Sequence, residues 1–219
     1  MCAPSVKPVL LALAIVVGLF VQGTKVHAGK LETTVLAGGC FWCVESDFES
    51  VKGITKVVSG YSGGSSADAS YKKVSKGGTG HYEVVQITYN PSKVSYDEIL
   101  RLFLRSVDPT DAGGQFCDRG NSYRTAIFVS NDAERAAAEA AIATAQADLG
   151  RKIVTPIKAS TPFYKAEDYH QDYYKGKKIV VTRRGPKSQA SAYKYYRAAC
   201  GRDARVQALW GDMAPFVGH

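Results

Sequence analysis

The stretch ETTVLAGGCFWCVESDFESV, residues 32–51, predicts a strand, a glycine turn and a helix in direct succession. Its first part, residues 32–36, is rich in β-branched and apolar side chains, and Gly38 and Gly39 follow it. The apolar residues of the second part recur at the spacing of one helical face: Phe41, Val44, Phe48 and Val51. Cys40 is thereby set at the N-terminus of the helix, where free backbone N–H groups and the helix dipole favour a thiolate.

The rest of the chain mixes strands and helices without the regular alternation of a doubly wound sheet. Further strands are expected at residues 54–58, 81–89, 123–129 and 153–157, with a glycine-rich turn at 60–64. Helices are expected at residues 95–107, 131–150, 166–174 and 188–199. No repeat or linker interrupts this order. We therefore predict a single α+β domain, a two-layer sandwich with a mixed β-sheet and flanking helices.

The domain is preceded by a predicted signal peptide, residues 1–28. Lys7 stands before an apolar run at residues 9–21, and the segment ending in Ala28 has the pattern of a cleavage site before Gly29. The run is shorter than the roughly 20 residues that a membrane-spanning helix needs. We therefore expect residues 29–219 to be exported, as a periplasmic or secreted protein without a membrane anchor.

The chain is basic, with 28 lysines and arginines against 20 acidic residues and a formal net charge of +8. Such a balance would suit an acidic partner. The basic residues are nevertheless scattered along the sequence and form no stripe on a predicted helix. We therefore expect no binding to nucleic acid.

Four cysteines remain after the predicted cleavage: Cys40, Cys43, Cys117 and Cys200. An exported protein can form disulfides, and four cysteines can pair in three ways. Zinc sites usually combine two close cysteine pairs, or cysteines with histidines. Only Cys40 and Cys43 are close here and the histidines have no ligand spacing, so we expect no metal. Disulfide exchange at Cys40 and Cys43 stays open as an alternative function.

Two further features accompany Cys40. Phe41 and Trp42 lie between the close cysteines, and adjacent aromatic rings can form an apolar pocket for a methyl or thioether group. On the strand at residues 81–89, Glu83 falls in line with three apolar residues of the same face. Its carboxyl is expected among apolar side chains, where desolvation raises a carboxyl pKa and keeps a proton available near neutral pH.

Several motifs in fixed order resemble those of the peptide methionine sulfoxide reductases of the A type. The motifs cover most of the chain after the predicted signal peptide: GCFW (39–42), GYSGG (60–64), GHYEVV (80–85), DPT (108–110), Asp118 with YRTAI (123–127), and FYKAEDYHQ (163–171). Each could arise by chance, but the ordered set is highly specific. The resemblance implies reduction of methionine sulfoxide, with the S epimer at sulfur as substrate and without a metal or an organic cofactor.

The resemblance also implies a cycle of cysteine oxidation. Cys40 would attack the sulfoxide sulfur, release methionine and become a sulfenic acid, while Glu83 protonates the sulfoxide oxygen. A second cysteine would condense with the sulfenic acid to a disulfide, which a thioredoxin-like donor reduces. The implied substrates are oxidised proteins or peptides and free methionine sulfoxide, and the expected enzyme is a monomer.

The same resemblance assigns the substrate pocket. Phe41 and Trp42 would hold the methyl group, Tyr61 and Tyr123 would donate hydrogen bonds to the sulfoxide oxygen, and Asp118 would lie near the substrate backbone.

The cysteine that resolves Cys40 stays open between two schemes. In the first, which we prefer, Cys43 resolves it, because a short separation gives a high effective concentration. Cys117 and Cys200 are then a structural pair or simply buried. In the second scheme, Cys200 or Cys117 takes part in a relay.

Overall fold

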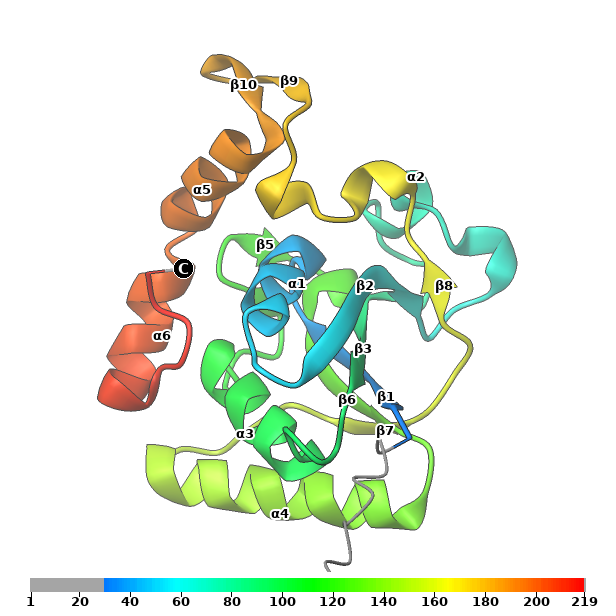
Figure 1. The fold of residues 1–219 in the computed structure, drawn as a ribbon, viewed down its shortest axis with the longest axis vertical. Helices are drawn as coiled ribbons and strands as arrows, with labels where there is room; N and C mark the ends of the chain where they lie inside the picture. Colours follow the sequence, from blue (N-terminus) through cyan, green and yellow to red (C-terminus); the bar gives the residue numbers. More distant parts are fainter. Residues whose placement is uncertain (1–29, 219) are drawn as a thin grey trace, which may run out of the picture.

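The computed structural model describes residues 30–218 (Figure 1). The predicted signal peptide, residues 1–28, lies outside the described residues. Within them, no helix combines the length and the apolar character that crossing a membrane requires.

A six-stranded sheet forms the centre of the fold, with the order β7-β6-β1-β3-β2-β8. Its neighbouring strands are antiparallel except for β6 and β7, which are parallel, so the sheet is mixed as predicted. The strands are β1 (Glu32–Gly38), β2 (Ile54–Ser62), β3 (Tyr82–Tyr89), β6 (Thr125–Val129), β7 (Ile157–Ala159) and β8 (Tyr164–Lys165). Two short antiparallel hairpins stand apart from it: β4 (Gly114–Gln115) with β5 (Asp118–Arg119), and β9 (Ile179–Thr182) with β10 (Gly185–Ser188).

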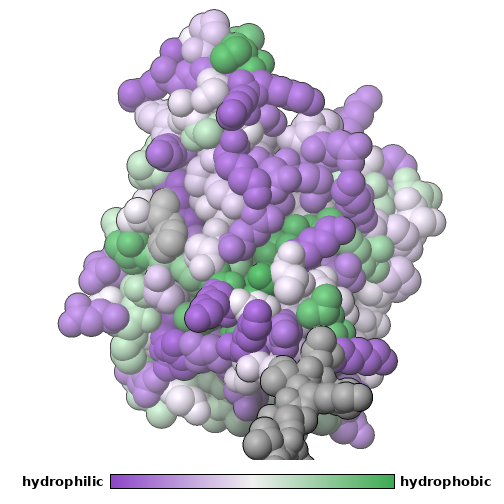
Figure 2. All heavy atoms as spheres, viewed as in Figure 1, coloured by the Kyte–Doolittle hydropathy of each residue, from purple (hydrophilic) through white to green (hydrophobic). Residues whose placement is uncertain are grey.

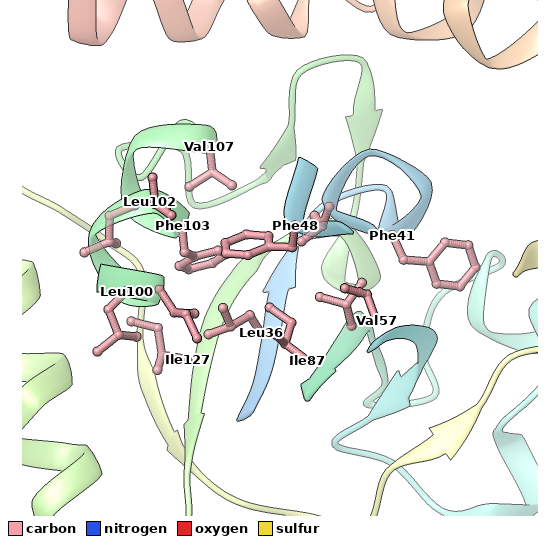
Figure 3. Close-up of a cluster of buried hydrophobic side chains, with 14 of the residues drawn as sticks. Leu36, Phe41, Phe48, Val57, Ile87, Leu100, Leu102, Phe103, Val107 and Ile127 are labelled. Atoms are coloured by element: carbon pink, nitrogen blue, oxygen red, sulfur yellow. The ribbon is translucent and has the colours of Figure 1, made fainter. Parts of the chain in front are cut away.

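The main core fills the space between one face of the sheet and the helices α1 (Phe41–Glu49) and α3 (Tyr96–Ser106). Figure 3 shows Phe48 of α1 and Phe103 of α3 above Leu36 and Ile87 of the sheet, with Phe41 at one end of this layer. The helix α4 (Asp132–Leu149) packs against α3, the edge strand β7 and its neighbour β6. This arrangement confirms the predicted α+β fold.

The last two helices, α5 (Gln189–Ala199) and α6 (Arg202–Trp210), run along one edge of the molecule, beside α1 and α3 (Figure 1). The predicted helix at 188–199 is confirmed with Ser188 as its N-cap, and Gly201 in the left-handed conformation separates it from α6. Above them the β9–β10 hairpin projects from the body. Figure 2 shows a small hydrophobic patch at this end of the molecule, where Ile179 and Val181 are exposed.

Side chains cap the helices that were predicted to begin at Ser95 and Asn131. The Ser95 hydroxyl accepts a hydrogen bond from the Glu98 amide at 3.1 Å, and Asn131 does the same for Glu134 at 2.9 Å. Gly150, with φ of 63°, ends α4.

Three local expectations were wrong. The segment at 60–64 is a turn only from Gly63 onward, because Gly60, Tyr61 and Ser62 continue β2. A side chain at Gly60 would approach the Phe163 ring and the Tyr164 carbonyl to 2.5 Å, so glycine here allows β8 to pair with β2. The other two corrections concern the strand predicted at residues 153–157 and the helix predicted at residues 166–174. Strand β7 begins at Ile157 instead of 153, and residues 166–174 form separate 3₁₀ turns, η3 (Asp168–His170) and η4 (Tyr173–Lys175).

Candidate functional site

The glycine turn between β1 and α1 places Cys40 just beyond the C-terminal end of β1, a central strand of the sheet. Gly39 has a φ of 81°, and a side chain there would come within 2.5 Å of Gln115, so both its conformation and its surroundings require glycine. Cys40 is the N-cap residue of α1, as predicted, and the amide of Cys43 donates to its carbonyl oxygen at 3.1 Å. The two thiols are thus separated by one turn of backbone, and both are buried and free.

A small cavity of about 80 Å³ opens above this turn. Its lining comes from five different segments of the chain: Cys40, Phe41, Trp42, Tyr71, Glu83, Asp118, Tyr123 and Tyr196. A larger cavity of about 480 Å³ lies between α3 and α4, but its lining is mainly alanine and arginine and contains no nucleophile. The chemistry of the described residues therefore points to the smaller cavity.

Glu83 is the buried acid of this cavity. Its side chain enters from β3 and is 2 % exposed, and its carboxylate accepts a hydrogen bond from the Phe41 amide at 3.1 Å. Desolvation by burial raises the pKa of Glu83 to about 8, with Asp118 and Cys43 adding to the rise and the Phe41 amide opposing it. The group therefore holds its proton at neutral pH, as the apolar row in the sequence indicated.

The thiol of Cys40 behaves differently from the expectation for a helix start. Burial raises the pKa of Cys40 well above its ordinary value, and its hydrogen bond with Cys43 and the nearby charge of Glu83 act in the same direction. The expected thiolate at Cys40 is therefore wrong for the free protein, because loss of water outweighs the helix dipole. The pKa of Cys43 is lowered instead, first by the hydrogen bond with Cys40 and further by Arg202 and Arg197.

Tyr61 does not line the cavity. Its side chain is fully buried beside Phe41, with ring centroids 5.9 Å apart, and its hydroxyl donates to Glu167 at 2.8 Å. The other carboxylate oxygen of Glu167 accepts from the amide of Tyr71 at 2.9 Å. Tyr71, the first residue of α2 (Tyr71–Val74), lines the cavity in its place.

Sequence reasoning missed Tyr71 because it lies in a polar stretch outside the motifs that carried the resemblance. It also missed Tyr196, on α5. The one available signal for Tyr196 was its place one helical turn before Cys200.

Trp42 is held in a fixed orientation by two contacts. Its indole N–H donates to Nδ1 of His170 at 3.1 Å, and its ring stacks on Tyr173 at 3.8 Å with the planes 6° apart. Burial lowers the pKa of His170 to about 4, so this imidazole is neutral and able to accept the bond. The predicted aromatic wall is therefore rigid before any ligand arrives.

The Cys117–Cys200 disulfide joins the loop at the cavity rim to the end of α5, with Cα atoms 4.9 Å apart. Close to it, the hydroxyl of Tyr196 donates to the carboxylate of Asp118. This pairing agrees with the first of the two cysteine schemes. Cys117, Asp118 and Cys200 lie close enough together to hold a metal ion, but the disulfide takes up the sulfur atoms of both cysteines.

A second cluster of side chains close enough to share a metal ion, among the described residues, consists of Glu45, Glu49 and Asp172. Lys175 pairs with Glu49 at 2.6 Å and with Asp172 at 2.8 Å, and Glu45 accepts hydrogen bonds from the Ser59 hydroxyl at 2.8 Å and the Asp172 amide at 3.0 Å.

Comparison with known proteins assigns this arrangement to a family. Residues 32–206 match the family model described as peptide methionine sulfoxide reductase. The chain belongs to the peptide methionine sulfoxide reductase family. It is 46% identical over 188 residues to the peptide methionine sulfoxide reductase MsrA 2 of Rhizobium meliloti, covering 86% of this chain and 88% of that one. It is 45% identical to the MsrA 2 protein of Caulobacter vibrioides, covering 93% and 97%.

Solved structures of reductases in this family share the fold. The reduced form of Mxr1 from Saccharomyces cerevisiae has a TM-score of 0.64 and 34% sequence identity, covering 67% of this chain and 85% of that chain. Methionine sulfoxide reductase A of Corynebacterium diphtheriae has a TM-score of 0.59 and 28% identity, covering 66% and 74%.

Within this reductase fold, the structure brings most of the predicted site residues to one cavity: Cys40, Phe41, Trp42, Glu83, Asp118 and Tyr123. Cys43 lies beneath Cys40 in a cluster with Tyr193, outside the lining. Tyr61 is buried behind Phe41, whereas the Cys117–Cys200 disulfide lies at the rim, with Cys117 exposed; none of the three residues lines the cavity.

Proposed function

We propose that this chain reduces the S epimer of methionine sulfoxide, in peptides and as the free amino acid, with Cys40 as nucleophile and Glu83 as general acid. One observation carries the proposal: a thiol, a carboxyl protonated at neutral pH and a rigid aromatic wall meet in a single small cavity. Phe41 and Trp42 supply the apolar surface that a methyl group on sulfur requires.

The first step transfers oxygen from the substrate to Cys40. The sulfur of Cys40 attacks the sulfoxide sulfur while Glu83 delivers its proton to the sulfoxide oxygen. The S–S bond just formed and the S–O bond of the substrate then break as the oxygen passes to the Cys40 sulfur, so methionine leaves as the thioether and Cys40 becomes a sulfenic acid. The thiol proton of Cys40 replaces the one that Glu83 gave, so protons balance.

Two tyrosine hydroxyls are available to orient the sulfoxide oxygen. Burial raises the pKa of Tyr71 to about 12 and raises that of Tyr123 as well, so both remain hydrogen-bond donors at neutral and mildly alkaline pH. Tyr61 has no such role, because its hydroxyl is bound to Glu167. It acts as a positioning residue, since Glu167 also holds the amide of Tyr71.

The second step closes a disulfide between Cys40 and Cys43. The sulfur of Cys43 displaces the sulfenic oxygen, which leaves as water. Cys43 is favoured over the other two cysteines because it follows Cys40 by one turn, whereas Cys117 and Cys200 are bonded to each other. A thioredoxin-like dithiol then reduces the Cys40–Cys43 disulfide, and no metal or organic cofactor takes part. We propose that the enzyme acts as a monomer.

Activity with dithiothreitol as reductant tests the proposal directly. Wild type is expected to release methionine from a sulfoxide peptide, and Cys40→Ser is expected to release none. Glu83→Gln should slow the sulfoxide step by about 10²–10⁴-fold, the usual contribution of a general acid. Because Glu83 has a pKa of about 8, the wild-type rate should lose its acid-dependent contribution above that pH, and Glu83→Gln should lack this falling limb.

A protein that reduces insulin disulfides but leaves sulfoxides untouched would be a disulfide exchanger instead. A rate for Glu83→Gln equal to wild type across neutral and alkaline pH would remove Glu83 as the acid.

The two tyrosines offer a matched pair of variants. Tyr71→Phe removes a hydroxyl that faces the cavity, and kcat should fall by about 10²-fold, the scale for one lost oxyanion donor. Tyr61→Phe removes one buried hydrogen bond, which should lower the free energy of unfolding by about 1 kcal/mol and reduce kcat far less. Steady-state kinetics and urea unfolding measure both effects. The reverse order of the two kcat values would return the donor role to Tyr61.

A single turnover identifies the resolving cysteine. After one equivalent of sulfoxide without reductant, peptide mapping should find Cys40 linked to Cys43 and the Cys117–Cys200 bond intact. In Cys43→Ser, Cys40 should remain a sulfenic acid that a dimedone-type probe traps. Linkage of Cys40 to Cys200 or Cys117 in wild type would support the relay instead.

We further propose that the enzyme works outside the cytoplasm as residues 29–219, periplasmic or secreted. The Cys117–Cys200 disulfide supports this proposal, because such bonds persist in oxidising compartments. N-terminal sequencing of the product exported by the native host is expected to begin at Gly29. Retention of Met1 would contradict cleavage.

A further inference from the structure

The face of α1 that carries Cys43 also carries a buried charge cluster. Cys43 and Asp47 are four residues apart on the helix, so they share one side of it. Asp47 is fully buried, and its carboxylate accepts from the guanidinium of Arg197 at 2.6 Å. The guanidinium of Arg202 lies 3.7 Å from the other carboxylate oxygen. Both arginines come from the C-terminal helices, and they are 4 % and 2 % exposed.

Among the described residues, Arg202 shares its carboxylate partner, Asp47, with Arg197. Its guanidinium donates to the carbonyl oxygens of Gly38 at 3.2 Å and Ser106 at 3.0 Å, and it lies over the ring of Phe116 at 4.8 Å. These acceptors are neutral, so they hold the side chain without cancelling its charge. The Nε atom of Arg202 is buried without a hydrogen-bond partner.

Arg197 shares its charge between two acids. Besides Asp47 it binds Asp203, whose side chain is partly exposed, and it donates to the hydroxyl of Tyr193 at 3.0 Å. Arg202 has only the longer contact with Asp47, at 3.7 Å, so its charge is less compensated than that of Arg197. Through Asp47, both arginines lie on the side of α1 that carries Cys43.

We propose that Arg202, with Arg197, holds Cys43 as the thiolate that attacks the Cys40 sulfenic acid. This inference rests on the proposed function. It gives the C-terminal helices a part in resolving Cys40 through their arginines, without a reaction of Cys200. Both arginines are positioning residues, because they act through Cys43 and do not touch the substrate. The opposite directions of the two cysteine pKa values, raised for Cys40 and lowered for Cys43, support this assignment.

The step balances in atoms and electrons. The Cys43 thiolate forms the S–S bond as the S–O bond of the Cys40 sulfenic acid breaks, so Cys43 is oxidised and Cys40 is reduced. The departing hydroxide takes up the proton that Cys43 has lost and leaves as water. A thiol would be a much weaker nucleophile than the thiolate, and in a buried site a thiolate needs an adjacent cation.

The charges of other titratable groups near Cys43 also affect its pKa. These groups are Cys40, Glu83, Asp47, Tyr193 and Tyr196. Glu83 is protonated at neutral pH, and burial raises the pKa of Tyr193 and of Tyr196, so these three are neutral there. Burial raises the pKa of Asp47 while Arg197 and Arg202 oppose the rise, and its ion pair with Arg197 makes Asp47 the negative charge that faces Cys43.

The test titrates Cys43 directly. In the mature chain with Cys40→Ser and an intact Cys117–Cys200 bond, thiolate absorbance at 240 nm is followed against pH, with Cys40→Ser/Cys43→Ser subtracted. Arg202→Met should raise the midpoint by about one pH unit or more, the scale for an adjacent opposite charge. Arg202→Lys should restore most of the shift. Arg205→Met is the matched control on the same helix, because Arg205 pairs with Asp108 at 2.7 Å and should leave the midpoint unchanged.

A variant of opposite sign keeps the test decisive if Arg202→Met does not fold. Asp47→Asn preserves the shape and removes the opposing charge, so it should lower the Cys43 midpoint. If the arginine had only a structural role, the Cys43 midpoint would shift in the same direction in both variants or in neither. An unchanged midpoint in Arg202→Met, or an unchanged or raised one in Asp47→Asn, would overturn the inference.

Rapid-quench kinetics links the titration to the reaction. With Cys40 restored, Arg202→Met at pH 7 should release the first methionine at the wild-type rate and form the disulfide up to about tenfold more slowly, in proportion to its lost thiolate. Equal slowing of both steps would contradict a specific effect on Cys43. If wild type releases no methionine at all, the proposed function fails, whereas the absorbance titration still decides the charge effect.

Discussion

The Phe41 amide donates a hydrogen bond to the Glu83 carboxylate across the contact between α1 and β3, and the rest of the site depends on this contact. It requires the helix to begin directly above the sheet, which the two glycines of the turn permit. It also takes the carboxyl, the two thiols and the aromatic rings out of water together. Burial then supplies the chemistry, because a carboxyl in this environment keeps a proton that an exposed one would lose.

The helix α1 separates two electrostatic environments. Toward β3 it faces Glu83 and the cavity, where desolvation keeps Glu83 and the phenols neutral and holds the Cys40 proton. Toward the C-terminal helices it faces Arg197 and Arg202, whose charge favours an anion. The cysteines of the CxxC sequence, three residues apart, point into these different environments, so one motif can supply a protonated nucleophile and a more acidic partner.

The C-terminal segment completes the site in several ways at once. Tyr196 closes one wall of the cavity and binds Asp118, while η4 carries Tyr173, on which Trp42 stacks. The disulfide joins this segment to the rim of the cavity. Arg202 of the segment binds the carbonyl of Gly38, and Arg197 binds the carboxylate of Asp47. Helices that lie at the edge of the fold in Figure 1 are thus part of the reactive centre.

The sequence by itself determined the strand, turn and helix around Cys40, the capped helices, the aromatic pair and the placement of Glu83 in an apolar row. These features are set by the periods of strand and helix and by glycine conformation, which act between near neighbours in the chain. Only the tertiary structure decided that Tyr71 and not Tyr61 enters the cavity, that burial suppresses the Cys40 thiolate, and that arginines lie under Cys43. Those outcomes depend on contacts between residues as far as 164 positions apart and on the exclusion of water, neither of which a local pattern can specify.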